Sequence, residues 1–150
     1  INYIKNNKIL IGENNKNELN ILLICAKIFH YREGIERFIQ KIEKYFFKKL
    51  KNNDNNKINI YVKFHPSDFF SKTYITKINY KKLINDFIPV EYYDLSFFDY
   101  ILSPPNTSII NIKIHKLFNE EKLYFYEVPQ HKIKKKYMLM SKFKIQKISI

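Results

Sequence analysis

Two polar clusters in this sequence carry the residue types that bind and activate phosphate groups. The first is His65 followed at once by Pro66, and the second is Asn106-Thr107-Ser108. An imidazole, as an N–H donor or protonated, can stabilise the negative charge on a departing phosphate. Hydroxyl groups beside the free backbone N–H groups of a helix's first turn form an anion site. We therefore expect both clusters to contact a phosphoryl group.

Each cluster also has a purely structural explanation, and the residue types alone do not choose between the two. A histidine at a strand end is commonly structural, and Thr107 or Ser108 would make an ordinary helix N-cap. The cap and the phosphate contact are compatible, because one hydroxyl can cap the helix while the other binds. Gly12 either lets the backbone approach a nucleotide or simply ends a strand.

The apolar patterning predicts the elements that must position these clusters. Strands are expected over residues 8–12, 58–64, 98–103 and 122–128, and helices over residues 18–30, 33–50, after Pro89, and from residue 109 onward. Residues 80–86 suit a short strand or a helix equally well. Strands that alternate with helices indicate an α/β fold with a parallel, Rossmann-like sheet flanked by helices. Because ligands bind outside the carboxyl ends of such strands, Gly12, His65 and Thr107 are expected along one rim.

The composition restricts the class of protein and of partner. The chain has 150 residues, of which 45% are hydrophobic and 27% charged, which fits one folded domain and argues against disorder. The net charge of +13 favours nucleic acid, anionic lipid or an acidic small molecule or polymer as partner. The abundance of Lys, Asn, Ile, Tyr and Phe is typical of an AT-rich genome, so a merely solvated basic surface explains much of this charge.

The sequence predicts neither a disulfide nor a metal site. Cys25 is the single cysteine and lies in an apolar run, so it reads as a buried, inert thiol. His30, His115 and His131 have no metal-ligand spacing with one another or with Cys25. We interpret these three histidines as structural or surface residues and expect no metal requirement.

Neither a membrane-spanning segment nor a signal peptide is apparent, so a cytoplasmic location is expected. Residues 132–150 read as a basic, weakly amphipathic tail that is either solvated or in contact with anionic lipid or an acidic glycan. That contact would place the protein on the inner face of the bacterial inner membrane. The chain starts at Ile1, so we expect it to be part of a longer protein.

Three motifs together resemble bacterial sialyltransferases and polysialyltransferases, over residues 8–128. Residues 62–66 read Val-Lys-Phe-His-Pro, similar to the family's HP motif, usually Lys-x-His-Pro after a strand. Thr107-Ser108 resembles the second motif, which is usually Ser-Ser or Ser-Thr. Residues 88–91 read Ile-Pro-Val-Glu and look like an Ile-Pro-x-Glu element, and residues 9–12 look like the first strand of the family's second domain.

The resemblance implies the C-terminal, nucleotide-binding domain of a GT-B-type glycosyltransferase. The implied donor is CMP-sialic acid or a related CMP-sugar, and the acceptor an acidic or lipid-linked glycan of capsule or lipooligosaccharide. Glu91 would accept the ribose hydroxyls, although a carboxylate also suits the first turn of a helix. His65 is the implied catalytic residue, and the implied nucleotide-binding residues are Gly12, His65, Pro66, Glu91, Asn106, Thr107 and Ser108. The family's Asp/Glu-Asp-Gly motif, which carries the general base, is absent from this sequence and belongs to an N-terminal acceptor domain.

Two other functions remain open at this point. The basic, aromatic-rich composition permits a nucleic-acid-binding protein, but no RNP, KH, zinc-finger or helix-turn-helix motif is present, so we expect no nucleic-acid partner. A catalytically inactive component of glycan export or assembly could retain the same fold. The leading prediction is an active sialyltransferase-like enzyme that is incomplete without its other domain.

Overall fold

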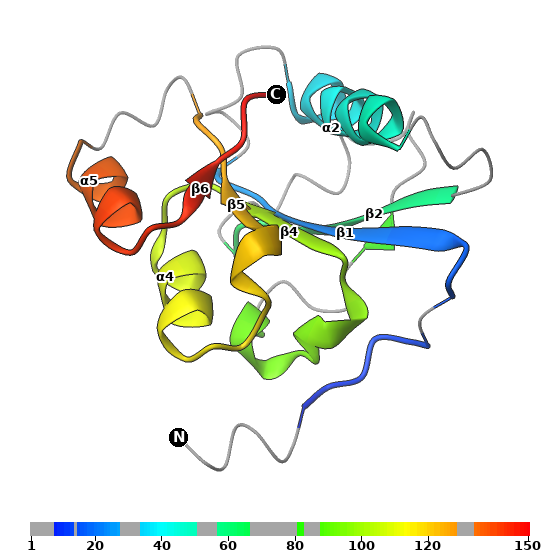
Figure 1. Ribbon diagram of the computed structural model, residues 1–150, viewed down its shortest axis with the longest axis horizontal. Helices are drawn as coiled ribbons and strands as arrows, with labels where there is room; N and C mark the ends of the chain where they lie inside the picture. The colour runs from blue at the N-terminus through cyan, green and yellow to red at the C-terminus, as the bar shows by residue number, and fades with distance from the viewer. Residues whose placement is uncertain are drawn as a thin grey trace.

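A parallel sheet lies at the centre of the protein, with helices on both faces (Figure 1). The computed structural model describes residues 8–13, 15–27, 34–50, 57–66, 81–82, 88–128 and 134–150. The strands are β1 (Glu18–Ile24), β2 (Lys57–Lys63), β3 (Lys81–Lys82), β4 (Tyr100–Ser103), β5 (Leu123–Phe125) and β6 (Gln146–Lys147). The helices are α2 (Ile35–Lys49), α4 (Thr107–Ile114) and α5 (Lys134–Lys142), with 3-10 turns η2 (Val90–Tyr92), η3 (Leu95–Phe97) and η4 (Glu120–Lys122).

The strand order is β3-β2-β1-β4-β5-β6, and every pairing between the described strands is parallel. This is the order of the Rossmann fold, in which the chain builds outward from β1 on one side and then returns to build on the other. The prediction of an α/β fold with a Rossmann-like parallel sheet is therefore confirmed.

Two hydrophobic clusters cover the two faces of the sheet. Ile21 and Leu23 of β1 pack in the cluster beneath α2, whereas Leu22 and Ile24 pack in the cluster shared with α4, η2 and η3. This alternation is the period of two that a strand imposes on its side chains. Figure 1 shows the resulting layers, with α2 on one side of the sheet and α4 on the other.

The predicted helix over residues 18–30 is wrong, because residues 18–24 form β1 at the centre of the sheet. A strand buried on both faces reads as a continuous apolar run without alternation, and such a run cannot be told from a buried helix by its pattern. Ile21, Leu22 and Leu23 are all fully buried. Asn20 is buried as well, and the Asn59 side chain on β2 donates a hydrogen bond to its side-chain oxygen at 3.0 Å.

The predicted strand over residues 8–12 is also wrong. Ile9 makes one isolated parallel bridge to Tyr93, outside the sheet, and its N–H donates to the Tyr92 carbonyl at 2.9 Å. Leu10 is 74% exposed, so this run is not the buried first strand that its composition suggests. The first strand of the fold begins only at Glu18.

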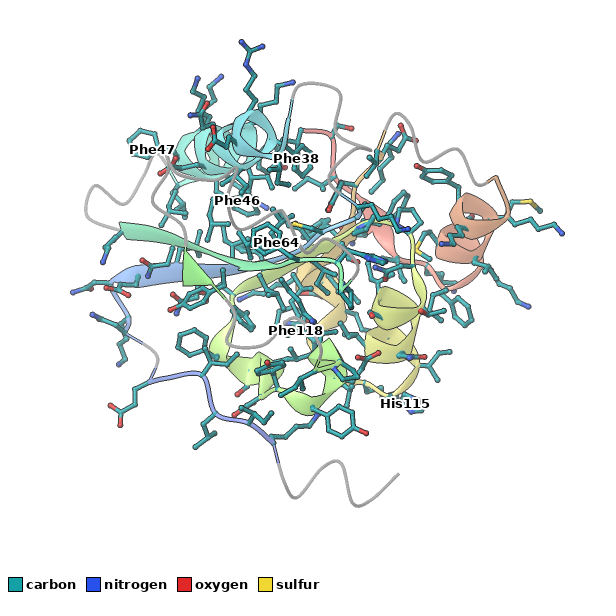
Figure 2. All side chains as sticks on the ribbon, turned by 180° about the vertical axis from the view of Figure 1, so that it is seen from behind. Phe38, Phe46, Phe47, Phe64, His115 and Phe118 are labelled. Atoms are coloured by element: carbon teal, nitrogen blue, oxygen red, sulfur yellow. The ribbon has the colours of Figure 1, made fainter. Side chains whose placement is uncertain are left out.

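The other predicted elements are confirmed with small shifts in their bounds. The strands near residues 58–64, 98–103 and 122–128 are β2, β4 and β5, and the helix predicted over residues 33–50 is α2. The α2 helix buries Ile35, Ile39, Ile42 and Phe46 against the sheet. Figure 2 shows Phe46 beneath the helix and Phe47 at its outer side, as helical spacing requires. The helix predicted after Pro89 is instead a short 3-10 turn of three residues, and β3 is the described part of the ambiguous region.

Residues 134–150 are part of the domain rather than an independent tail. They form α5 and β6, and β6 pairs in parallel with β5. Met140, Ile145 and Ile148 are buried in the two clusters. Within the described residues, no helix is both long and apolar enough to cross a membrane.

One buried hydrogen bond ties the end of β1 to the segment after β5. The Tyr126 hydroxyl donates to the Ile24 carbonyl at 2.7 Å, and the Tyr126 side chain is 1% exposed. Tyr126→Phe should lower the free energy of unfolding by about 1–2 kcal/mol, since it leaves a buried carbonyl without this donor. Urea unfolding measures the change.

Tyr92→Phe is the matched control, because Tyr92 is 45% exposed and its hydroxyl has no hydrogen bond to another described residue. It should change the unfolding free energy by less than about 0.5 kcal/mol. Equal effects of the two substitutions would contradict the assignment of this hydrogen bond.

Candidate functional site

A cavity of about 370 Å³ lies where the carboxyl ends of β1, β2 and β4 meet. The connection after β1 leads to β2 on one side, and the connection after β4 leads to β5 on the other side. The space between β1 and β4 is therefore the switch point, at which α/β sheets bind ligands. The volume is in the range of small-molecule sites. The cavity is lined by Ile24, Cys25, Lys63, Phe64, His65, Pro66, Ile88, Pro89, Val90, Asn106, Thr107, Ser108 and Lys136.

His65 and Pro66 reach this cavity from the end of β2. The strand ends at Lys63, and His65 follows two residues later, half-buried. Lys63 and His65 are two residues apart, the spacing at which extended residues project to the same side. Proline cannot donate in a sheet, so Pro66 is compatible with the end of the strand here.

The N-terminus of α4 reaches the same cavity from the end of β4. Asn106 is the helix cap, and its side-chain oxygen accepts the Ile109 N–H at 3.0 Å. The Ser103 hydroxyl lies 3.3 Å from the same oxygen. Asn106, and neither Thr107 nor Ser108, is therefore the N-cap of α4.

Thr107 and Ser108 consequently keep their hydroxyls for other partners. Neither hydroxyl has a hydrogen bond within the described part of the chain. Thr107 is exposed and Ser108 half-buried, and both line the cavity. With the first N–H groups of α4 beside them, they can hold an anion.

The charged side chains that line the cavity, among the residues the structure describes, are all basic. Lys63, His65 and Lys136 line it, and no Asp or Glu does so among the described residues. Lys63 is 6% exposed, so its charge acts in surroundings that screen it less than bulk water does. The lining therefore favours an anionic ligand, with apolar surface from Ile88 and Val90 beside it.

Gly12 does not line this cavity. It is exposed, and a Cβ built on it would lie 3.3 Å from Cε2 of Phe97. The close approach at this glycine is thus to an aromatic ring of η3. The prediction for Gly12 required residues 8–12 to form a strand of the sheet. Because they do not, Gly12 is not at the carboxyl end of a strand and lies away from the cavity.

Glu91 follows two lining residues, Pro89 and Val90, but does not line the cavity itself. Its Oε1 accepts a hydrogen bond from Nδ2 of Asn111 on α4 at 3.0 Å. Its Oε2 is buried and has no hydrogen-bond partner in the described structure. In this conformation the carboxylate joins η2 to α4, and neither oxygen faces a ligand in the cavity.

Lys8 reinforces the same corner of the fold. Its ammonium donates to the backbone carbonyl of Glu91. Burial lowers the pKa of Lys8 from its usual value, and the charges of Asp94 and Glu91 oppose that shift. Glu91 is therefore contacted through both its backbone and its side chain, which is the environment of a positioning residue.

Three of the lining residues that were given no site role from the sequence carry a thiol or an ammonium group. Cys25 is only 4% exposed, as its prediction as a buried thiol requires, but it also borders the cavity. Lys63 was recognisable, because it stands two residues before His65 at a strand end. Lys136 had no such signal, since only the packing of α5 brings it to the cavity.

No cluster of three or more metal-ligating side chains occurs among the residues that the structure describes. His115 is exposed at the end of α4, away from the helix N-terminus that lines the cavity (Figure 2). His30 and His131 lie outside the described residues.

Comparisons with protein-family models, curated proteins and solved structures give no match to this chain.

The Glu91–Asn111 bond makes a testable contribution to stability. Asn111→Ala should lower the free energy of unfolding by about 1–3 kcal/mol, because both Glu91 oxygens would then be without partners near the core. In a double-mutant cycle with Glu91→Ala, urea unfolding should give a coupling of about 0.5–3 kcal/mol. Strictly additive effects would contradict the contact.

Proposed function

We propose that this chain is the nucleotide-binding, C-terminal domain of a GT-B-type glycosyltransferase that uses CMP-sialic acid or a related CMP-sugar. Its product would be an extended cell-surface glycan, such as capsule or lipooligosaccharide. One observation carries the proposal. The HP pair and the Thr-Ser pair, far apart in sequence, line a single cavity at the switch point of a Rossmann-like sheet.

The chemistry of sialyl transfer suits the lining of this cavity. As the bond to the anomeric carbon breaks, negative charge builds on the leaving phosphate and the sugar becomes oxocarbenium-like. Thr107, Ser108 and the N–H groups of α4 supply donors for the phosphate, and His65 can donate a hydrogen bond or a proton to it. Pro66 limits the backbone freedom of the turn that carries His65.

The base that activates the acceptor hydroxyl is not supplied by this cavity, since no Asp or Glu lines it in the described structure. In the proposal that base comes from an N-terminal acceptor domain outside this sequence. The domain alone should therefore bind nucleotide without turning over donor and acceptor.

Glu91 and Gly12 take roles other than those first expected. Asn111 lies on α4 one turn after Ser108, so its bond to Glu91 helps to hold the helix N-terminus at the cavity. Glu91 is thus proposed as a positioning residue. Gly12 is left with the structural role of admitting the Phe97 ring.

The two rival functions predict different ligands. A catalytically inactive glycan-assembly component would use the same cavity. Replacing His65 with Ala in the full-length protein separates the two, because an unchanged phenotype would favour the inactive component over the enzyme. A nucleic-acid-binding protein would use an extended basic surface, and it would shift random RNA in a salt-dependent manner. The concave, basic lining of the cavity favours a small phosphorylated ligand.

CMP should bind the isolated domain more tightly than UDP or GDP in a calorimetric titration. His65→Ala and the double variant Thr107→Ala/Ser108→Ala should each weaken CMP binding by about tenfold or more, the effect of losing hydrogen bonds to a charged phosphate. EDTA should leave the affinity unchanged, because the described lining has no carboxylate to hold a metal.

His115→Ala is the matched control, since it removes an exposed imidazole from the opposite end of α4. It should leave CMP affinity within twofold of the unchanged protein (about 0.4 kcal/mol). A preference for UDP, or loss of binding in EDTA, would overturn the CMP-sugar assignment.

The outer face of α5 supports a peripheral contact with anionic lipid. Lys135, Met138, Leu139 and Lys142 fall within about 100° of one another around the helix. Met138 is 71% and Leu139 38% exposed, with the lysines exposed beside them. Two apolar side chains flanked by lysines suit the headgroup region of an anionic bilayer.

Vesicle sedimentation tests this contact. The domain should bind phosphatidylglycerol vesicles and not phosphatidylcholine vesicles. Met138→Glu/Leu139→Glu should reduce the bound fraction severalfold, because it removes both apolar side chains and offsets the charge of the two lysines. Phe47→Glu, on the outer side of α2 at 68% exposed, is the control and should have little effect. Equal losses from both helices would indicate non-specific attraction only.

A further inference from the structure

Among the described residues that line the cavity, Lys136 alone comes from the C-terminal α5–β6 unit. We infer that its ammonium binds the phosphate of the nucleotide, so that this unit forms one wall of the nucleotide site. The identity of the ligand rests on the proposed function, whereas the role of Lys136 follows from its own position and charge.

The geometry of α5 directs Lys136 inward. Each residue turns an α-helix by about 100°, so Lys136 stands about 40° from Met140 around the helix. Met140 is fully buried in the core shared with α4 and η2. Lys135 stands about 140° from Met140 and is exposed. Lys136 therefore points to the cavity, whereas its neighbour Lys135 points to solvent.

The unit that carries Lys136 is packed in place. Ile145 is buried with Met140, and β6 pairs with β5 just after it. The Ile148 N–H donates to the Phe125 carbonyl at 2.9 Å, which continues this attachment. The backbone position of Lys136 is thus set before any ligand binds, so binding orders only the side chain.

The charge of Lys136 is uncompensated within the described structure. Its ammonium makes no hydrogen bond or ion pair with a described residue. By contrast, Lys113 pairs with Glu120, and Lys147 pairs with Glu127 at 2.8 Å. A half-buried cation with no partner among the described residues, on a wall where no described carboxylate lies, is suited to bind an anion there.

Titration of CMP against Lys136→Gln and Lys135→Gln tests the inference. Lys136→Gln should weaken CMP binding about tenfold. This loss lies between that expected for an exposed ion pair and that expected for a well-ordered hydrogen bond to a charged group. Lys135→Gln removes the same charge one residue away and should change the affinity less than twofold (about 0.4 kcal/mol). Lys136→Arg should restore most of the binding, and all three variants should unfold at the same urea concentration as the unchanged protein.

A second readout separates a phosphate contact from a structural role. Raising the salt concentration should weaken CMP binding less in Lys136→Gln than in Lys135→Gln, because one screened charge pair has been removed. Equal CMP affinities in the two variants would overturn the inference while leaving the nucleotide site intact. If UDP or GDP binds in place of CMP and Lys136→Gln weakens it, the CMP-sugar donor fails and the Lys136 contact stands. If no nucleotide binds, both are overturned.

Discussion

The burial of β1 on both faces determines where this protein can hold a ligand. Its apolar side chains pack alternately under α2 and against the α4 side, so β1 must lie in the interior of the sheet. With β2 on one side of it and β4 on the other, the carboxyl ends of three strands meet at one place. The chain leaves β1 in one direction and returns to β4 in the other, which keeps that place free of a crossing connection.

Several polar contacts hold the walls of the cavity in place. Tyr126 hydrogen-bonds the carbonyl of Ile24, a lining residue, and Asn106 caps α4 so that its hydroxyl neighbours remain available. Glu91 joins η2, next to the lining residue Val90, to α4. These contacts stabilise the arrangement before any ligand arrives, which lowers the entropic cost of binding.

The electrostatic character of the cavity comes from what surrounds it as much as from what lines it. The Glu91 carboxylate, next to the lining residue Val90, is engaged with Asn111, and no acidic side chain lines the cavity in the described structure. Lys63 and His65 approach from the end of β2 and Lys136 from α5, so basic side chains from two separate elements gather at one place. A net charge of +13 alone would not distinguish this from a solvated basic surface. The gathering of basic side chains in one concave place distinguishes the cavity from such a surface.

Much of the fold was predictable from local pattern. The strand signals near residues 58–64, 98–103 and 122–128 and the amphipathic α2 were recognised because each shows a period or a proline boundary. The first strand was misplaced for a physical reason. Residues 8–12 look like a buried run but leave Leu10 exposed, whereas β1 lacks alternation because both of its faces are buried.

The sequence by itself determined the α/β class and the polar pairs at the ends of β2 and β4, because those depend on neighbouring residues. Only the tertiary structure decided that Asn106 takes the cap, that Glu91 contacts Asn111, and that Lys136 reaches the cavity. Each of these depends on which surfaces meet when helices pack on the sheet. That meeting is set by burial of apolar area over the whole chain, and no short stretch of sequence encodes it.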